Sequence, residues 1–299
     1  MATSTAEIGL LNEPIVSSSN WRRNVLLKMR RNPIGAAAGV VCVLLILLAF
    51  FGSSFAPYDA NRLDFVRLQS PSLTHPFGTD NLARDMLSRI MFGASNSLGV
   101  AFFAILFSMV IGVMLGVTSG YLGGWLDLIA QRVIDIMLAY PAIVFVIFFV
   151  TIFGRNKPSV ILAIGFILVP GTVRIVRSAT IGIRHQPFIE AALSIGASPV
   201  RIMFRHVLPN VAAPIIIVAS VQIGVAILIE SAISFLGQGV SSATAPSWGR
   251  MLQETRPSWQ LAWWTMMVPG VAISVAVVAF NMFGDALRDW LDPRLRGSR

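Results

Sequence analysis

The sequence predicts an all-α polytopic membrane protein with six transmembrane helices and with both termini in the cytoplasm. Three observations predict this fold class. Hydrophobic residues make up 55% of the 299 residues. Charged residues make up only 12%, whereas roughly 25% is typical of soluble domains. Six apolar runs are each close to the roughly 20 residues with which a helix crosses a bilayer.

The first apolar run covers residues 33–56 and follows an N-terminal tail, residues 1–32, that is rich in Ser. The tail carries five Lys and Arg residues, and the run is too long for the apolar part of a signal peptide. We therefore expect an uncleaved first transmembrane helix. Cys42 is the only cysteine, so no disulfide framework exists and Cys42 is expected to be a small packing residue.

Residues 57–96 form a long polar segment on the expected extracytoplasmic side. Asp80 is expected to cap an amphipathic helix that ends at Gly93, with Asp85 and Arg89 paired at i, i+4. Its apolar face consists of Ala83, Met86, Leu87, Ile90 and Met91. We expect this helix to lie on the membrane surface or against the bundle.

Residues 97–284 are expected to form the transmembrane core. Its spans are predicted at about 97–120, 129–153, 159–177, 210–232 and 265–284. In the third span, Arg132 and Asp135 are most simply an ion pair within one helix. Of the prolines in the spans, Pro269, followed by Gly270, is the expected flexing point.

The distribution of Lys and Arg predicts the orientation. With both termini inside, 15 of the 23 basic residues face the cytoplasm. Residues 178–209 then form a cytoplasmic loop, 233–264 a second extracytoplasmic loop and 285–299 a cytoplasmic tail. Because the basic residues flank apolar runs and form no stripe, the net charge of +9 does not indicate a nucleic-acid partner.

The cytoplasmic loop contains two short predicted helices. Pro187 begins the first, and Gly196 ends it. Its apolar stripe consists of Phe188, Ala191, Ala192 and Ile195. Ser198 and Pro199 begin the second helix, which carries Arg201 and Arg205 opposite its apolar face. A helix as short as the first is marginal in water, so it must pack on the bundle, on lipid or on another protein, and the residues alone leave these surfaces open.

Several other residues have two interpretations. Glu230, near the outer end of the fifth span, is either an interfacial residue or faces the outer mouth of a solute pathway. An interfacial aromatic belt is favoured over contact with another protein for the tryptophans of the second outer loop, Trp248, Trp259, Trp263 and Trp264.

Catalytic chemistry is not indicated. The only lysines, Lys28 and Lys157, lie outside any phosphate-binding Gly-x4-Gly-Lys-Ser/Thr motif, so this chain is not itself an ATPase. The three histidines lie in separate loops without other metal ligands at suitable spacing, and no nucleophile motif is present. The sequence places no chain of ionisable residues at mid-membrane, so a proton relay is not indicated. This favours an external energy source.

Residues 190–210, EAALSIGASPVRIMFRHVLPN, resemble the EAA loop of ABC importer permeases in residue type and spacing. Four further blocks, at 75–94, 127–141, 234–252 and 280–294, are similar to the dipeptide and oligopeptide permeases of this family. The resemblance covers nearly all of residues 75–294 and implies a type I ABC importer permease fold in a bacterial inner membrane.

The resemblance implies that the loop is a coupling helix, which seats in a groove of an ATP-binding subunit and transmits its closure. The residues carried over are Glu190, Ala191, Ala192, Gly196, His206, Leu208, Pro209 and Asn210. To these the predicted helices add Phe188, Ile195 and Arg201. We expect the stripe to dock and Glu190 to fix the orientation.

The implied partners are a second permease subunit, one or more ATP-binding subunits, which hold ATP and Mg²⁺, an extracytoplasmic solute-binding protein and membrane lipid. No cofactor is expected in this chain. Glu230, Pro269 and Gly270 are candidate pathway or gate residues. Di- or oligopeptides are the expected substrates. Nickel or glutathione import within the same family, a gradient-driven carrier and a structural scaffold are the alternatives.

Overall fold

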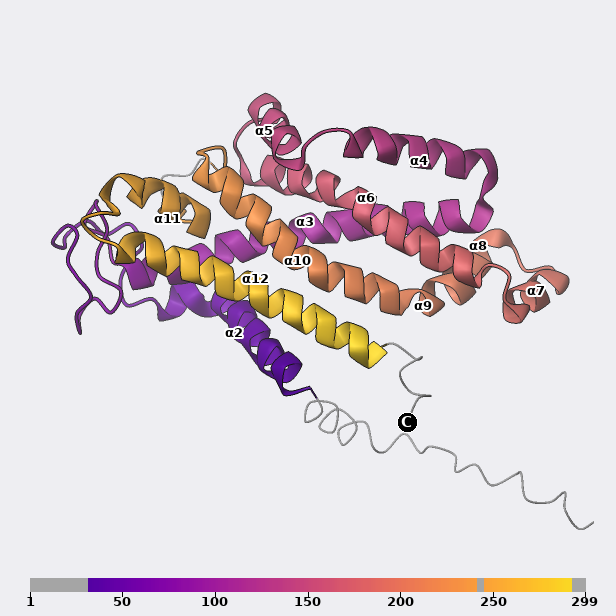
Figure 1. Ribbon diagram of the computed structural model, residues 1–299, viewed down its shortest axis with the longest axis horizontal. Helices are drawn as coiled ribbons and strands as arrows, with labels where there is room; N and C mark the ends of the chain where they lie inside the picture. Colours follow the sequence, from indigo (N-terminus) through magenta and orange to yellow (C-terminus); the bar gives the residue numbers. More distant parts are fainter. Residues whose placement is uncertain (1–31, 241–244, 292–299) are drawn as a thin grey trace, which may run out of the picture.

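The computed structural model describes residues 32–240 and 245–291, which form an elongated helical bundle (Figure 1). Its long helices are α2 (Pro33–Phe55), α3 (Met86–Leu122), α6 (Lys157–Ile183), α10 (Ala212–Phe235) and α12 (Trp264–Leu291). Each of these five is long and apolar enough to cross a membrane, and a bent pair of shorter helices raises the number within the described residues to as many as six. The fold is therefore the all-helical polytopic class that the sequence predicts.

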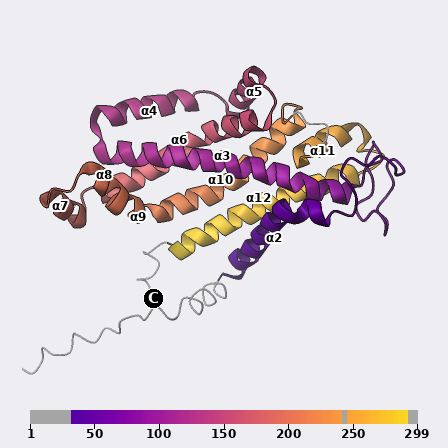
Figure 2. The same ribbon diagram turned by 180° about the vertical axis from the view of Figure 1, so that it is seen from behind.

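Short helices gather at the two ends of the bundle (Figures 1 and 2). One end, here the α7 end, carries α7 (Pro187–Ser194), α8 (Pro199–Ile202), a π-helical turn (Met203–Val207) and α9 (Leu208–Asn210). The other end, here the α11 end, carries α11 (Trp248–Thr255), the 3-10 turn Arg256–Ser258 and the loop that joins α2 to α3. The two predicted polar loops on either side of the fifth span thus lie at opposite ends of the molecule.

The bent pair is α4 (Gly124–Leu138) and α5 (Ala142–Phe153), which meet at an angle of 89°. The sequence predicts one span over 129–153, and the structure divides this span into two helices. Pro141 has no N–H to continue the helix, and its ring disfavours helical geometry at Tyr140. The chain therefore breaks between the two helices, and α5 leaves in a new direction.

The predicted separate helix ending at Gly93 is also wrong, because α3 begins at Met86 and runs through Gly93 to Leu122. Its N-cap is Asp85, whose side chain accepts a hydrogen bond from the backbone N–H of Ser88. Gly93 is not a helix stop. A Cβ at this position would lie 3.1 Å from Cδ1 of Trp248, so the glycine lets α11 approach α3 closely.

Small residues bring α3 and α6 together along most of their length. Gly112, Gly116 and Gly120 repeat at intervals of four on α3 and face α6. A Cβ on Gly116 would lie 2.8 Å from Cβ of Val176 and 3.1 Å from the backbone N of Arg177. Such close backbone packing is how membrane helices associate where lipid removes the hydrophobic driving force.

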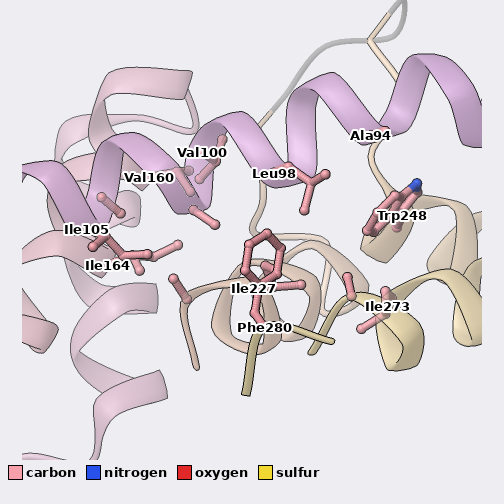
Figure 3. Close-up of a cluster of buried hydrophobic side chains, with 14 of the residues drawn as sticks. Ala94, Leu98, Val100, Ile105, Val160, Ile164, Ile227, Trp248, Ile273 and Phe280 are labelled. Atoms are coloured by element: carbon pink, nitrogen blue, oxygen red, sulfur yellow. The ribbon is translucent and has the colours of Figure 1, made fainter. Parts of the chain in front are cut away.

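A continuous hydrophobic core joins α3, α6, α10, α11 and α12 (Figure 3). Residues such as Val100, Ile164 and Ile227 are completely buried at its centre, and Trp248 extends it to the α11 end. Within the described residues the core also takes in Cys42 from α2, a buried packing residue as the sequence predicts. The outer faces of α2 and α4 remain apolar and exposed, as expected for helices in contact with lipid or a partner subunit.

Candidate functional site

The predicted coupling segment, residues 187–210, forms the α7 end. Pro187 occupies the first turn of α7, and Gly196 follows the helix with a positive φ of 79°, a conformation that favours glycine. Ser198 caps α8 by accepting a hydrogen bond from the backbone N–H of Arg201. The two helix starts are therefore where the sequence predicts them.

One face of α7 is attached to the bundle. Ile189 and Ala192 are buried in a second hydrophobic cluster together with Val176 of α6 and Ile202 of α8. The sequence interpretation missed Ile189, because it assigned the buried face to the stripe of Phe188, Ala191, Ala192 and Ile195. Most other members of this cluster come from α3, α6, α8 and the π-helical turn, so no spacing within α7 could have identified Ile189.

Most of the predicted stripe faces outward. The Ile195 side chain is 85% exposed, and Phe188 and Ala191 are exposed as well. Together with α8 and the π-helical turn, the stripe lines a hollow of about 450 Å³, here the α7 groove. Its lining is Phe188, Ala191, Ala192, Ile195, Ala197, Arg201, Arg205 and His206. The groove thus combines an apolar wall with a basic wall, and no carboxylate lines it.

The other predicted coupling residues lie beside the groove. Glu190 is exposed on α7, and none of the described residues pairs with its side chain. Leu208 is half-buried, and Asn210 donates a side-chain hydrogen bond of 2.7 Å to the carbonyl oxygen of His206. Pro209 lacks an N–H for the carbonyl of Arg205, which is consistent with the π-helical turn at this point. The segment then runs into α10 with the bond from Val211 N–H to the Val207 carbonyl.

Two Arg–Asp pairs hold α4 against α6. Arg177 contacts Asp127 through two hydrogen bonds of 2.6 Å, and Nη2 of Arg174 lies 2.9 Å from Asp135. The predicted pair of Asp135 with Arg132 is therefore wrong. Asp135 contacts α6 because α4 folds back along it, an arrangement that spacing within one helix cannot indicate.

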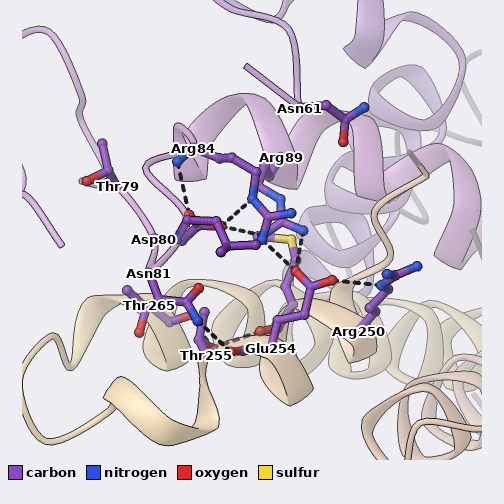
Figure 4. A network of polar contacts seen from close by, with 12 residues as sticks. Asn61, Thr79, Asp80, Asn81, Arg84, Arg89, Arg250, Glu254, Thr255 and Thr265 are labelled. Atoms are coloured by element: carbon purple, nitrogen blue, oxygen red, sulfur yellow. Dashed lines mark hydrogen bonds and ion pairs between the residues drawn. The ribbon is translucent and has the colours of Figure 1, made fainter. Parts of the chain in front are cut away.

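A network of ion pairs fixes the α11 end (Figure 4). Asp80 accepts hydrogen bonds from Arg84 and Arg89, at 2.7 and 2.6 Å. Both arginines also contact Glu254 of α11, at 2.6 and 2.8 Å, and Arg250 contacts the same carboxylate at 2.7 Å. Burial alone would raise the pKa of Glu254, but the positive charges of Arg89 and Arg84 outweigh it and lower the pKa to about 2.

The predicted pair of Asp85 with Arg89 and the predicted cap at Asp80 are both wrong. Asp85 caps α3 and lies 2.9 Å from Nδ1 of His75, so it is not available to Arg89. Asp80 instead accepts backbone hydrogen bonds from Leu82 and Arg84 inside the loop. The ion pair between Arg84 and Glu254, which are 170 residues apart, thus joins this loop to α11.

The tryptophans of the predicted aromatic belt differ in exposure. Trp259 and Trp263 are exposed, and for them the belt stays a prediction. Trp248 is completely buried and donates its indole N–H to the carbonyl oxygen of Ile90, and Trp264 donates to the carbonyl oxygen of Thr79. The belt interpretation is wrong for Trp248 and Trp264, because Trp248 is buried against α3 and Trp264 is buried under the loop that joins α2 to α3.

The three pathway or gate candidates lie in α10 and α12. Glu230 is buried and accepts a hydrogen bond of 2.8 Å from the hydroxyl of Ser234, so it occupies neither an exposed interface nor an open mouth in this conformation. Pro269 lies within α12, and no atom comes within 4 Å of a Cβ at Gly270. Their role in a gate stays a prediction.

Two family models match this chain, and both describe membrane components of transport systems. Residues 110–297 match the sequence model of a family described as "binding-protein-dependent transport system inner membrane component". Residues 19–71 match that of the N-terminal transmembrane domain of oligopeptide transport permease C.

Two curated relatives are similar over almost their whole length. The chain is 41% identical over 283 residues to the dipeptide transport system permease protein DppC of Alkalihalophilus pseudofirmus, covering 93% of this chain and 91% of the relative. It is 41% identical over 279 residues to the glutathione transport system permease protein GsiD of Escherichia coli, covering 93% and 90%.

A solved structure has a similar fold. It shows inward facing conformations of the MetNI methionine ABC transporter, and the matched chain superposes with a TM-score of 0.54 at 18% identity. The match covers 67% of this chain and 94% of that chain. At this identity the similarity concerns the fold alone.

Proposed function

The chain belongs to the family of binding-protein-dependent transport system inner membrane components, as an ABC importer permease of the peptide or glutathione type in the bacterial inner membrane, and we propose that it imports di- or oligopeptides. In this proposal it forms the translocation pathway with a second permease subunit. An extracytoplasmic binding protein delivers the substrate. ATP and Mg²⁺ are bound and ATP is hydrolysed by partner subunits, since this chain is not an enzyme.

The α7 groove carries the proposal that this chain couples to the ATP-binding subunit. Ile195 and Phe188 expose apolar surface to solvent, while Ile189, on the same helix, is held in the bundle. An apolar side chain that stays exposed on an anchored helix is suited to burial by a partner. Arg201 and Arg205 on the opposite wall favour a partner surface that carries carboxylates.

The same segment supports transmission of movement into the membrane. α8, the π-helical turn and α9 continue into α10 with only Val211 between them. A displacement of α7 and α8 is therefore passed to the end of α10, which packs against α3, α6 and α12. Glu190, exposed beside the groove, is available to fix the orientation of the docked subunit.

A charge introduced into the apolar wall of the groove tests the coupling proposal. In the full complex with its binding protein, Ile195→Glu should weaken attachment of the ATP-binding subunit by about tenfold or more, because it places a carboxylate where the partner would bury an apolar side chain, and the loss of an interface hot spot costs about 2 kcal/mol or more. Substrate-stimulated ATPase activity and uptake should fall with it. Leu193→Glu is the matched control, since Leu193 is half-exposed on α7 but does not line the groove. Equal loss in both variants, or full activity in both, contradicts the proposal.

Glutathione is the second candidate substrate, because the glutathione permease relative matches as well as the dipeptide permease relative. Uptake of labelled dipeptides and of labelled glutathione into proteoliposomes that contain the whole complex separates the two. ATP-dependent uptake of glutathione without dipeptide uptake would replace the peptide assignment. Uptake by this chain alone, without ATP, would overturn the importer proposal itself.

A further inference from the structure

A second hollow, of about 370 Å³, lies between α2 and α3 and is unrelated to the α7 groove. We call it the Lys157 groove. Phe50 of α2 and Phe102 and Phe103 of α3 form exposed aromatic walls, and Phe280 of α12 forms part of its floor. All of its lining is apolar except Ser95 and Lys157.

Lys157 provides a single positive charge at one end of this groove. It is the first residue of α6, it is half-buried, and none of the described residues forms a hydrogen bond or an ion pair with its ammonium group. Its Nζ lies over α3, 3.9 Å from where a Cβ on Gly99 would stand. The N-terminus of α6 adds a partial positive charge at the same place.

The groove runs from a charged end to a hydrocarbon end. Lys157 begins α6 at the side of the bundle toward the α11 end, whereas Phe280 lies in the middle of the 28-residue α12. No acidic side chain lines the groove, so the ammonium requires an anion from elsewhere. The exposed Phe walls would at the same time hold a flexible apolar chain.

We propose that the Lys157 groove binds one anionic phospholipid, with its phosphate on Nζ of Lys157 and one acyl chain between α2 and α3. A Lys ammonium group near the membrane surface attracts an anionic lipid headgroup. A free inorganic anion would bind only the ammonium group and would make no contact with the aromatic walls. A lipid without an anionic group would contact only the walls and leave the ammonium group unpaired.

The bound chain would also support α2. Phe50 and Ile46 on α2 line the groove and are 76% and 45% exposed. An acyl chain in this space would contact both side chains, so the lipid is expected to fill the gap between α2 and the rest of the bundle.

Native mass spectrometry of the purified complex, incubated with equimolar phosphatidylglycerol and phosphatidylcholine, tests the proposal. The unsubstituted complex should retain phosphatidylglycerol about fivefold more than phosphatidylcholine, the selectivity expected of one Lys beside an anionic headgroup. Lys157→Gln should abolish this preference, and Lys157→Arg should keep it. Arg155→Gln is the matched control, because Arg155 lies two residues away but does not line the groove.

Gly99→Leu tests whether the space of the groove is needed for binding. A Cβ at Gly99 would have only Nζ of Lys157 near it, at 3.9 Å, so the leucine enters the groove beside the ammonium group. It should reduce retention of both lipids. The proposal is overturned if Lys157→Gln retains the preference, if Gly99→Leu leaves retention unchanged, or if millimolar inorganic phosphate or a dipeptide displaces the lipid.

Discussion

The indole N–H of Trp248, in the first turn of α11, donates a hydrogen bond of 3.0 Å to the carbonyl oxygen of Ile90 in α3. The backbone N–H of Trp248 donates a second bond, also 3.0 Å, to the hydroxyl of Ser97. One buried residue therefore fixes α11 to α3 from both its side chain and its main chain. Gly93 provides the space for the indole ring.

Trp248→Phe is expected to lower the free energy of unfolding by about 1–3 kcal/mol, because it removes a buried hydrogen bond and leaves a smaller side chain in a close-packed site. Thermal unfolding of the purified protein in detergent measures the change. Trp259→Phe should have no comparable effect, since Trp259 is exposed. Equal shifts in the two variants would show that α11 does not depend on the buried ring.

Gly116→Ala is expected to destabilise the protein by about 1–3 kcal/mol, because the new Cβ would overlap Val176 and the backbone of α6. Gly182→Ala is the control within α6. No atom lies within 4 Å of a Cβ there, so the change should be neutral or stabilise the helix by up to about 1 kcal/mol. Denaturation midpoints of both variants, compared with the original protein, check the difference in sign.

Glu254 is expected to make the α11 end sensitive to acid. Its folded-state pKa of about 2 lies below its ordinary value of 4.5, so the ionised carboxylate favours the folded state. This contribution is fully present above pH 4.5 and is lost as the pH falls toward 2. Unfolding temperatures measured between pH 7 and pH 2 should therefore decline in this window.

Glu254→Gln should destabilise the protein at neutral pH, because Arg84 and Arg89 lose a partner, and should weaken the decline between pH 4.5 and 2. Asp64→Asn is the control. Asp64 pairs with Arg62 in an exposed position where an ion pair contributes little. An unchanged pH profile in Glu254→Gln would mean that other carboxylates dominate acid unfolding.

Asp127→Asn is expected to cost more stability than Asp135→Asn, although each removes one Arg–Asp pair between α4 and α6. The Asp127 and Arg177 side chains are 18% and 30% exposed and share two hydrogen bonds. The Asp135 and Arg174 side chains are 53% and 54% exposed and share one hydrogen bond, so their pair should be worth about 0–1 kcal/mol. Comparing the two variants by thermal unfolding in the same detergent checks the order.

Local signals in the sequence were sufficient for the features that depend on neighbouring residues. Pro187, Gly196 and Ser198 define the short helices of the α7 end because each acts on the backbone within one turn. The long apolar runs likewise predicted the membrane helices. The break between α4 and α5 has a local signal too, because Pro141 cannot continue an α-helix.

Features that depend on distant residues could not be predicted in the same way. Arg89 has a suitable carboxylate four residues earlier, yet it contacts Glu254, which lies 165 residues away. Trp248 has the sequence context of an interfacial residue, but α11 folds onto α3 and buries it. Ile189 and the glycines of α3 are ordinary apolar or small residues whose importance comes from the helix that they meet.

The π-helical turn at Met203–Val207 determines the rotation of α8 about the helix axis relative to α10. It contains one residue more than an α-helical turn, and each residue rotates a helix by about 100°. The basic wall of the α7 groove is thus offset in rotation from the faces that α10 presents to the membrane. Removing one residue here would leave the sequence motif almost intact while rotating α8 by about 100° relative to α10, so the spacing of the loop, as much as its composition, is under constraint.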